Sequence, residues 1–370
     1  MFRLMILSAY LLPGIYTYFR LRHLLSEKIH KVLFTVFYII LMLSFPLTEF
    51  VSHGSVSGWI KYLVLPGYYS LPFLLYLFLL LLVFDLFLGV NRLVKLVPAE
   101  TLRGRNFRLI VFWVIITCST AIVAIGAVHL NTIRVAEYKI AVPRGSAGIS
   151  HLRIAMAADF HLGQLTRNGF LETFAAKINA LQPDILLIPG DIVEGHRDDG
   201  DTEEFARQFR RIKTKYGIYA SPGNHESHGG NNTMAFFAHA GIEVLADRGV
   251  AIDNSFCLVG RNDRHYINRI PINRLLDTLP PRLPVIVLDH RPVDLEEASM
   301  NRVDIQVSGH THYGQLFPLN FIIKNLYRLP WGYTKIRGTH FFVTSGIQVW
   351  GPPIRTAGNS EIMMIDVEFN

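Results

Sequence analysis

The stretch SGHTHYGQLFPLNFII, from Ser308 to Ile323, places two histidines between an apolar strand pattern and a second apolar run. His310 and His312 are one residue apart and follow VDIQV, a short segment typical of a buried strand. Residues i and i+2 of a strand point to the same side, so both imidazoles can face one cavity. Gly309 before them lets the chain turn sharply. The pattern predicts two metal ligands at a strand end.

Short apolar runs alternate with amphipathic helical patterns throughout the sequence after His129. The runs include LRIAMAADF, DILLIPG, GIYASPG, PVIVLDH and VDIQVSG. Between two of them, Phe170–Leu181 carries its apolar residues on one face of a helix. Continuous apolar strands between amphipathic helices predict an α/β fold whose sheet is covered on both faces. In such folds, ligands bind beyond the carboxyl ends of the strands.

Five of these strand ends carry side chains that bind metal ions in proteins. Imidazole, carboxylate and amide oxygen together suit Mn, Fe, Zn or Co, whereas calcium favours more oxygen and structural zinc favours thiolates. Each motif alone is more often a capping or hydrogen-bonding group, but five in series make coincidence improbable. The candidates are Asp159 and His161, Asp191, Asn224 with His225 and Glu226, Asp289 with His290, and His310 with His312.

The motifs D-x-H, G-D, G-N-H-E, H and G-H-x-H, in this order, resemble those of the calcineurin-like metallophosphoesterase superfamily. The resemblance covers about Leu152 to Asn370. The closing segment GIQVWGPPIRTAGNSEIMMIDV, Gly346–Val367, looks like the C-terminal end of the bacterial membrane-associated branch. The resemblance implies a four-layer αββα sandwich, two packed sheets flanked by helices, with a site for two divalent metal ions.

The resemblance also implies which motif residues bind the two ions. Asp191 is expected to bridge them. The implied ligands are Asp159, His161 and His312 for one ion, Asn224, His290 and His310 for the other, and Asp191 for both.

Three further residues have expected or open roles. The resemblance implies that His225 is the acid or a stabiliser of the transition state, with Glu226 orienting it. Arg355 is expected either to hold a second phosphate or an anionic headgroup, or to be a surface residue. Asp289 precedes a ligand and has no assigned role.

The first 130 residues contain four apolar stretches that nearly match the length of a membrane span. A hydrocarbon core of about 30 Å takes about 20 helical residues. The stretches are Leu4–Phe19, Val32–Phe50, Tyr69–Val90 and Leu109–His129. They predict a transmembrane domain of about four helices over residues 1–130, followed by a catalytic domain over residues 131–370.

Basic residues are concentrated in the same N-terminal part. Up to Leu130 there are 11 Lys and Arg against 4 Asp and Glu, and the other 25 basic and 25 acidic residues cancel. The balanced remainder gives no reason to expect nucleic-acid binding, which needs a basic patch on the folded domain. Most of the N-terminal charges fall in the first and third predicted loops, which predicts that these loops are cytoplasmic. The catalytic domain of this multi-pass protein is then extracytoplasmic.

The sequence leaves open the roles of Asp85 and of the segment from Leu316 to Gly338. Asp85 lies inside the third predicted span, where the sequence offers no obvious partner. The segment from Leu316 to Gly338 mixes aromatic with basic residues. It suits a membrane interface, or it is a packed loop that closes the sandwich.

These features predict a membrane-anchored phosphoesterase in which two metal ions activate a hydroxide. The expected substrate is a phosphodiester or pyrophosphate that is lipid-linked or amphiphilic, with membrane lipids as partners. One alternative is a receptor or scaffold whose metal-binding domain has lost catalysis. Another, for a cytoplasm-facing domain, is a pyrophosphatase of the UDP-diacylglucosamine type. A transporter is disfavoured because charges are scarce within the spans, and metal identity and oligomeric state are left open.

Overall fold

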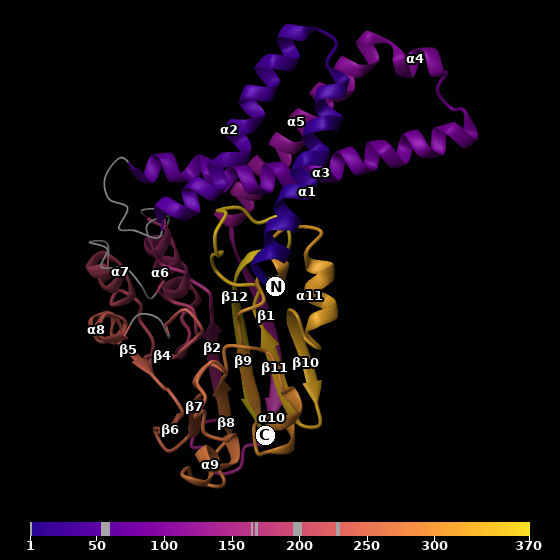
Figure 1. Cartoon of the computed structure of the whole chain (residues 1–370). Helices are drawn as coiled ribbons and strands as arrows, with labels where there is room; N and C mark the ends of the chain where they lie inside the picture. The colour runs from indigo at the N-terminus through magenta and orange to yellow at the C-terminus, as the bar shows by residue number, and fades with distance from the viewer. Residues whose placement is uncertain (1, 53–59, 164–165, 167–168, 195–201, 227–229) are drawn as a thin grey trace. The chain divides into compact units, whose positions relative to one another are not determined.

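The computed structural model describes the chain except for residues 1, 53–59, 164–165, 167–168, 195–201 and 227–229. The chain divides into two units (Figure 1). The first comprises Met1–Val128 with Gly351–Ile354, and the second comprises His129–Trp350 with Arg355–Asn370. Helices build the first unit, whereas strands and helices alternate in the second.

The helices of the first unit include three segments long and apolar enough to cross a membrane. These segments are Lys28–Val51, Val64–Val94 and Arg105–Leu130. The fourth predicted span, Leu4–Phe19, falls in α1; the side chains of residues 1–8 lie outside the description, and this span stays a prediction. The helices are α1 (Phe2–Leu24), α2 (Lys28–Ser52), α3 (Ile60–Val94), α4 (Ala99–Arg103) and α5 (Arg105–Leu130).

Helix α3 is longer than the hydropathy pattern predicts, since it begins at Ile60 rather than near Tyr69. Pro66 and Pro72 lie inside it. Proline lacks an N–H group and usually interrupts a helix. In apolar helices it is tolerated because neighbouring helices and side chains satisfy the freed backbone groups. The segment between the predicted spans Val32–Phe50 and Tyr69–Val90 is therefore helical from Ile60 onward, contrary to the expected loop.

Asp85 in α3 has partners that the sequence does not indicate. Arg20 forms an ion pair with it, and the Tyr16 hydroxyl donates a hydrogen bond to its Oδ2 at 2.5 Å. Both partners belong to α1, which packs against α3. An unpaired carboxylate within apolar helices is costly, so this pairing explains how the helix accommodates the charge.

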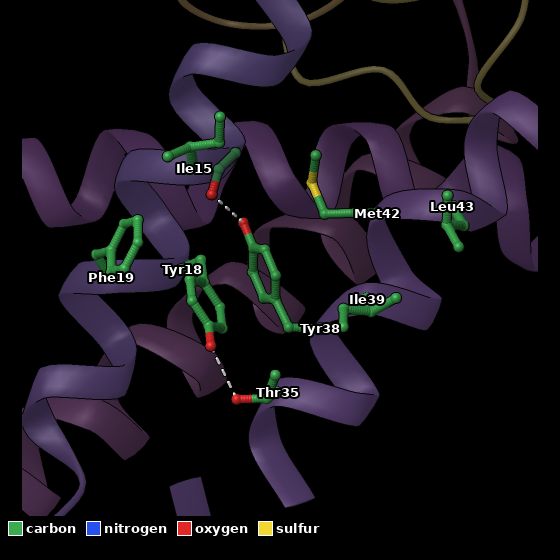
Figure 2. Close-up of a pocket in the computed structure, with 9 residues that line it drawn as sticks. Ile15, Tyr18, Phe19, Thr35, Tyr38, Ile39, Met42 and Leu43 are labelled. Carbon is green, nitrogen blue, oxygen red and sulfur yellow. Dashed lines mark hydrogen bonds between the residues drawn. The ribbon is translucent and has the colours of Figure 1, made fainter. Parts of the chain in front are cut away.

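Helices α1 and α2 enclose an apolar pocket of about 520 Å³ (Figure 2). Tyr38 donates a hydrogen bond to the Gly14 carbonyl at 2.8 Å, and the hydroxyls of Tyr18 and Thr35 are 3.0 Å apart. A Cβ on Gly14 would lie 2.5 Å from Met42 Cε, so glycine permits the close approach. These contacts hold the two helices together through small residues and satisfied hydroxyls.

The second unit contains two six-stranded sheets with the orders β1-β12-β2-β3-β4-β5 and β10-β11-β9-β8-β7-β6. Their core strands are apolar and buried along their whole length, as in β3 and β8. The strands are β1 (Ile133–Val142), β2 (His151–Met156), β3 (Ile185–Pro189), β4 (Ile218–Ser221), β5 (Ile242–Val244), β6 (Arg248–Ile252), β7 (Phe256–Gly260), β8 (Val285–Leu288), β9 (Ile305–Ser308), β10 (Gly332–Ile336), β11 (Thr339–Val343) and β12 (Ser360–Phe369).

Helices cover the outer faces of both sheets, which confirms the predicted four-layer sandwich (Figure 1). Phe174 of α6 and Phe209 of α7 pack on the first sheet, and Leu275 of α9 packs on the second. Ile154 of β2 and Leu258 of β7 belong to the core between the sheets. The helices are α6 (Phe170–Leu181), α7 (Thr202–Phe209), α8 (Gly230–Ala240), α9 (Ile272–Asp277), α10 (Leu295–Met300) and α11 (Asn320–Leu326), with a 3-10 turn η2 (His312–Gly314).

Strand direction determines where polar side chains gather in this unit. Strands β2, β3, β4 and β5 are parallel, and so are β7, β8 and β9. The carboxyl ends of neighbouring parallel strands lie at the same edge of their sheet. The segments that follow β2, β3 and β4 are therefore neighbours, as are those that follow β8 and β9.

Candidate metal centre

The segments after these strands bring the predicted ligands of both sheets together. The backbone N–H of His310 donates to both carboxylate oxygens of Asp159, at 3.0 and 3.1 Å. The two residues are 151 positions apart, which shows that the segment after β9 lies against the one after β2. The candidates follow β2 (Asp159, His161), β3 (Asp191), β4 (Asn224, His225, Glu226), β8 (Asp289, His290) and β9 (His310, His312).

Most of these ligands lie in turns and not on the strands, contrary to the expectation from strand alternation. β2 ends at Met156 and β9 at Ser308. A left-handed backbone costs a residue other than glycine of order 1–3 kcal/mol, and such residues cluster at functional sites. The residues with this backbone include Asp159 (φ 58°), His161 (43°), Asp191 (54°), His310 (72°) and His312 (47°). The paired side chains therefore reach the site through strained turns.

Glycine allows the close approach at this edge, as predicted. A Cβ on Gly190, whose φ is 83°, would lie 2.6 Å from His290 Nδ1. A Cβ on Gly223 would lie 2.2 Å from Asp191 Oδ1. Both distances are shorter than any stable contact, so a larger residue at either position would displace a candidate ligand.

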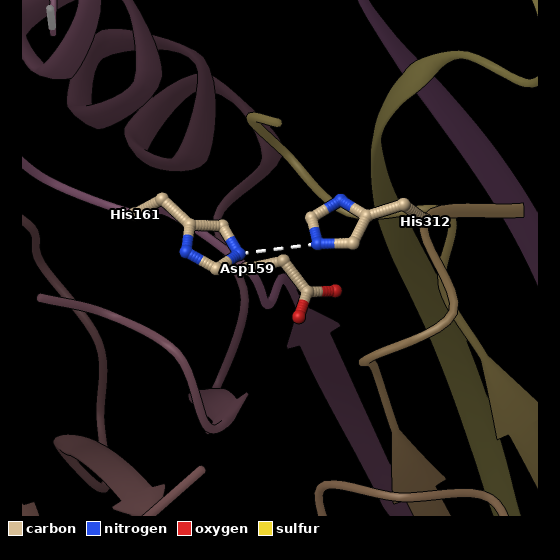
Figure 3. Close-up of side chains that lie close together, drawn as sticks. All are labelled: Asp159, His161 and His312. Carbon is tan, nitrogen blue, oxygen red and sulfur yellow. Dashed lines mark hydrogen bonds between the residues drawn. The ribbon is translucent and has the colours of Figure 1, made fainter. Parts of the chain in front are cut away.

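In the described part of the chain the ligand atoms form three groups, and the atoms of each group lie within 4.8 Å of one another. In the first group, His161 Nε2 and His312 Nε2 are 3.1 Å apart (Figure 3). Around Asp191, His290 Nε2 is 3.1 Å from Oδ2 and 3.2 Å from Asn224 Oδ1. The groups are Asp159, His161 and His312; His161, Asp191 and His225; and Asp191, His290 and His310. Because they share residues, the groups form one continuous centre.

The electrostatics of these buried groups suit bound cations. Burial raises the pKa of the Asp159 carboxyl. Burial lowers the pKa of His290, but the Asp191 charge raises it more, to about 10. Burial, together with His290, lowers the pKa of His310 to about 3. The Asp191 carboxylate thus stabilises positive charge on the neighbouring His290 ring, and a divalent cation can supply positive charge at the same place. Donor types, burial and charge therefore fit two divalent metal ions.

Glu226 contacts the backbone and not the ring of His225, which corrects the role expected of it. Its side chain is buried among N–H groups that follow β3 and β4. Burial and the nearby Asp191 charge raise the pKa of its carboxyl. The carboxylate accepts hydrogen bonds from the N–H groups of Asp191 (2.9 Å), Ile192 (2.5 Å), Val193 (3.1 Å) and Gly223 (2.7 Å). Glu226 therefore holds the Asp191 turn in place.

Glu194 is the residue that contacts the His225 ring, and the sequence analysis does not single it out. Its Oε2 lies 2.8 Å from His225 Nδ1, and its Oε1 lies 2.7 Å from His161 Nδ1. Burial raises the pKa of this carboxyl, but the two imidazole hydrogen bonds lower it to about 2. The available signal was the acidic residue three positions after Asp191, in the run GDIVE.

His225 belongs to the group with His161 and Asp191 and is only partly buried. Its backbone N–H donates to Asp191 Oδ1 at 3.0 Å, and its ring stands edge-on to the His161 ring. Burial lowers the pKa of this imidazole, but Glu194 and Asp191 raise it above its ordinary value. The hydrogen bond to Glu194 thus fixes the His225 ring at Nδ1, and the ring is still reachable from solvent.

Arg355 is fully buried, so a surface position does not describe it. Its guanidinium donates hydrogen bonds to backbone carbonyls of two segments beside the centre. The acceptors are the carbonyls of His312 (3.2 Å), Ser345 (2.7 Å), Gly346 (3.4 Å) and Gln348 (2.7 Å). Arg355 therefore holds the turn that carries His312. The expected contact with a phosphate stays a prediction, and the burial of Arg355 speaks against it.

Asp289 forms ion pairs with two arginines of the loop that follows β7. Arg269 contacts its Oδ2, and Arg261 Nη1 lies 3.6 Å from the same oxygen. The carboxyl is buried, so these cations compensate a charge that would otherwise be costly. Asp289 thus anchors that loop beside His290.

Residues 152–314 match the family model of the calcineurin-like phosphoesterases. The chain carries a calcineurin-like phosphoesterase domain. It is a metal-dependent phosphoester hydrolase, and enzymes of this class use two divalent metal ions, in keeping with the ligand groups described above. The resemblance seen in the sequence is confirmed.

Curated relatives share this phosphoesterase domain. An uncharacterized metallophosphoesterase of Aquifex aeolicus is 29% identical over 253 residues, which cover 65% of this chain and 94% of the relative. An uncharacterized metallophosphoesterase of Campylobacter jejuni is 28% identical, with 59% of each protein covered. A transmembrane protein with metallophosphoesterase domain from Danio rerio is 28% identical over 299 residues, covering 75% of this chain and 68% of the relative.

Solved structures of distant proteins also align with the chain. GAP50, the anchor in the inner membrane complex of Plasmodium, aligns with a TM-score of 0.36 and 11% identity, over 59% of this chain and 81% of that one. The sulfate thiohydrolase SoxB of Thermus thermophilus aligns with a TM-score of 0.34 and 11% identity, over 64% of this chain and 57% of that one.

We predict that Arg355→Met destabilises the fold without acting on substrate binding. Hydrogen bonds to buried carbonyls would be lost, and each unsatisfied group costs roughly 1–3 kcal/mol, so the free energy of unfolding should fall by about 3 kcal/mol. Denaturant unfolding of the full chain measures this, and Arg274→Met, at an exposed position on α9, serves as the control. A stable Arg355→Met variant with a raised KM would instead restore the substrate-binding role.

Proposed function

We propose that the chain is a membrane-anchored phosphoesterase that hydrolyses a phosphodiester or pyrophosphate bond of a lipid-linked or amphiphilic substrate. The observation that carries the proposal is the continuous centre in which two ligand groups meet at Asp191. Its residues come from five strand ends of two sheets, which is the arrangement expected of a catalytic edge and not of incidental surface polarity.

The proposed ligand assignment divides the centre into two halves. Asp191 is proposed to contribute to both, because its Oδ2 lies 3.9 Å from His161 Nε2 in one half and 3.1 Å from His290 Nε2 in the other. Two bound divalent ions would supply positive charge for the phosphoryl oxygens and would lower the pKa of a water molecule. Asp159, His161 and His312 would hold one ion, and Asn224, His290 and His310 would hold the other.

His225 is proposed to donate a proton or hydrogen bond toward the leaving oxygen. The ionised Glu194 carboxylate has no proton to give, so His225 Nδ1 must donate to it. That hydrogen bond fixes the orientation of the ring and leaves Nε2 for the substrate. Glu194 also bonds His161, so one carboxylate orients both a proposed ligand and the proposed acid.

An amphiphilic substrate is supported by the segment after His312. In α11 the polar Asn320 is buried, whereas Phe321, Ile322 and Leu326 are exposed. Exposed apolar residues grouped in this way mark an interaction surface. A packed loop would bury them, so the interfacial interpretation is the better supported of the two left open by the sequence.

The outward orientation of the catalytic domain remains part of the proposal. It rests on the basic residues at the end of α1 and the start of α2, and on those from Arg92 to Arg108. A scaffold without activity is less well supported, because every proposed ligand is present at the centre.

We predict that Asp191→Asn and His225→Ala each lower hydrolysis of a soluble aryl phosphodiester by the purified chain with Mn added. Loss of an acid–base group costs about 10²–10⁴-fold, so His225→Ala should fall in that range with its metal content unchanged. Asp191→Asn should also lose bound metal, measured by elemental analysis after dialysis. Equal rates in the wild type and both variants would refute the two-metal proposal.

We predict that Phe321→Ser with Ile322→Ser lowers turnover of a detergent-dispersed lipid phosphoester about tenfold, since apolar burial against the lipid is lost. Turnover of the aryl phosphodiester should stay unchanged. Met300→Ser on α10, which removes another exposed apolar side chain, is the matched control. Equal loss with both substrates, or no loss with the lipid, would count against an amphiphilic substrate.

We predict that a reporter fused after Asn370 lies outside the cytoplasm. Alkaline phosphatase should be active at that position and a fluorescent protein that folds only in the cytoplasm should not. The opposite result would overturn the proposed orientation and would favour the pyrophosphatase of the UDP-diacylglucosamine type.

A further inference from the structure

A second cavity, far in sequence from the ligand groups, lies within the first unit. It has a volume of about 610 Å³, which is in the range of ligand pockets. Helices α1, α3, α4 and α5 all contribute to its wall. The basic side chains that line it are Arg20, His23, Arg92, Lys95, Arg103 and Arg108.

The charge of this cavity is not balanced by protein groups. Among its described lining residues there is no carboxylate. Arg20 pairs with Asp85, but within the described part of the chain Arg92, Lys95 and Arg103 form no ion pair. Cations that converge on one space repel each other, so the arrangement favours an anion between them.

Buried donor atoms point to the same conclusion. The Nε atoms of Arg20 and Arg108 are buried without a hydrogen-bond partner in the described structure. Buried polar atoms are normally satisfied, and an exception calls for a partner that the chain does not supply. An anion in the cavity would add acceptor oxygens beside these two guanidinium groups.

The wall that carries two of the cations is fixed by a buried side chain. Asn91 is buried, donates to the Val97 carbonyl at 2.9 Å and accepts from the Val97 N–H at 2.7 Å. This pair of hydrogen bonds closes the turn between α3 and α4, in which Lys95 has a left-handed backbone at φ 56°. These hydrogen bonds thus fix the backbone of the turn, from which the exposed side chains of Arg92 and Lys95 extend.

The apolar residues that line the cavity indicate which class of anion it binds. Phe84, Leu88 and Phe107 line the same cavity, and they come from α3 and α5, which contain two of the segments able to cross a membrane. Phosphate chemistry matches the arginines, because a guanidinium donates two parallel hydrogen bonds to it. A cavity with a cationic part and an apolar part, between apolar helices, suits a phosphate joined to an acyl chain.

We propose that this cavity binds the phosphate headgroup of an anionic phospholipid. Positive charge near apolar helices also orients a membrane protein, but orientation requires only that the cations be on one side. It does not require that they converge on one cavity, and Lys28, Lys31 and Arg105 carry similar charge outside its lining. The site is independent of the phosphoesterase activity proposed above.

The test uses the full chain in nanodiscs of phosphatidylcholine containing a minor share of phosphatidylglycerol, with lipid retained after detergent extraction quantified by mass spectrometry. The wild type should retain phosphatidylglycerol over phosphatidylcholine. The variant Arg92→Gln, Lys95→Gln, Arg103→Gln should lose about tenfold or more of that enrichment, since each cation near a lipid surface contributes to anion binding. The matched control is Lys28→Gln, Lys31→Gln, Arg105→Gln, which removes the same charge.

Three outcomes would overturn the proposal. Equal loss in the control variant would show a general charge effect. Unchanged enrichment in the cavity variant would show that the cavity does not bind the lipid. Displacement of the lipid by millimolar glycerol 3-phosphate would assign the cavity to a soluble phosphate compound. Hydrolysis of the aryl phosphodiester should be the same in all three proteins, so failure here is distinct from failure of the catalytic proposal.

Discussion

The buried carboxylate of Asp191 is the group on which the catalytic centre depends. It is 2% exposed, lies 3.1 Å from His290 Nε2 and accepts the backbone N–H of His225. A charge this deeply buried is tolerated only with close, well-placed partners. Glu226 holds the turn of Asp191 by four backbone hydrogen bonds, and Gly190 and Gly223 leave room for the groups around it. The position of each other ligand is set relative to this carboxylate.

The fold tolerates the backbone strain of the left-handed turns because the sheets behind them are tightly packed. β3 and β8 are buried at every position, and the core between the sheets is continuous from β2 to β9. A left-handed turn after such a strand has no freedom to relax without moving the strand itself. Arg355 adds a second constraint, since it joins the turn of His312 to the segment from Ser345 to Gln348. The fold therefore keeps ligand atoms close together even where their charges and lone pairs oppose each other.

Local patterns in the sequence predict an α/β fold with candidate ligands at the strand ends, and the family resemblance adds the four layers and the proposed ligand assignment. Each candidate ligand follows an apolar run, and parallel strands bring such ends to one edge. The sequence does not predict which carboxylate reaches which ring. Glu226 is adjacent to His225 but points to the backbone, whereas Glu194, 31 positions away, contacts the imidazole. Burial of Arg355 and the pairing of Asp85 with Arg20 are missed for the same reason, since both depend on contacts between distant segments.

The two sites differ in the sign of the charge that they leave unbalanced, and this difference separates their chemistry. The catalytic centre gathers carboxylates and imidazoles, so it needs cations before it can receive a phosphoester. The cavity among α1, α3, α4 and α5 gathers guanidinium and ammonium groups, so it can receive a phosphate directly. Among the described residues that line it there is no carboxylate, whereas the catalytic centre contains several. The lipid phosphate proposed for this cavity would therefore bind without the metal ions that the catalytic centre needs.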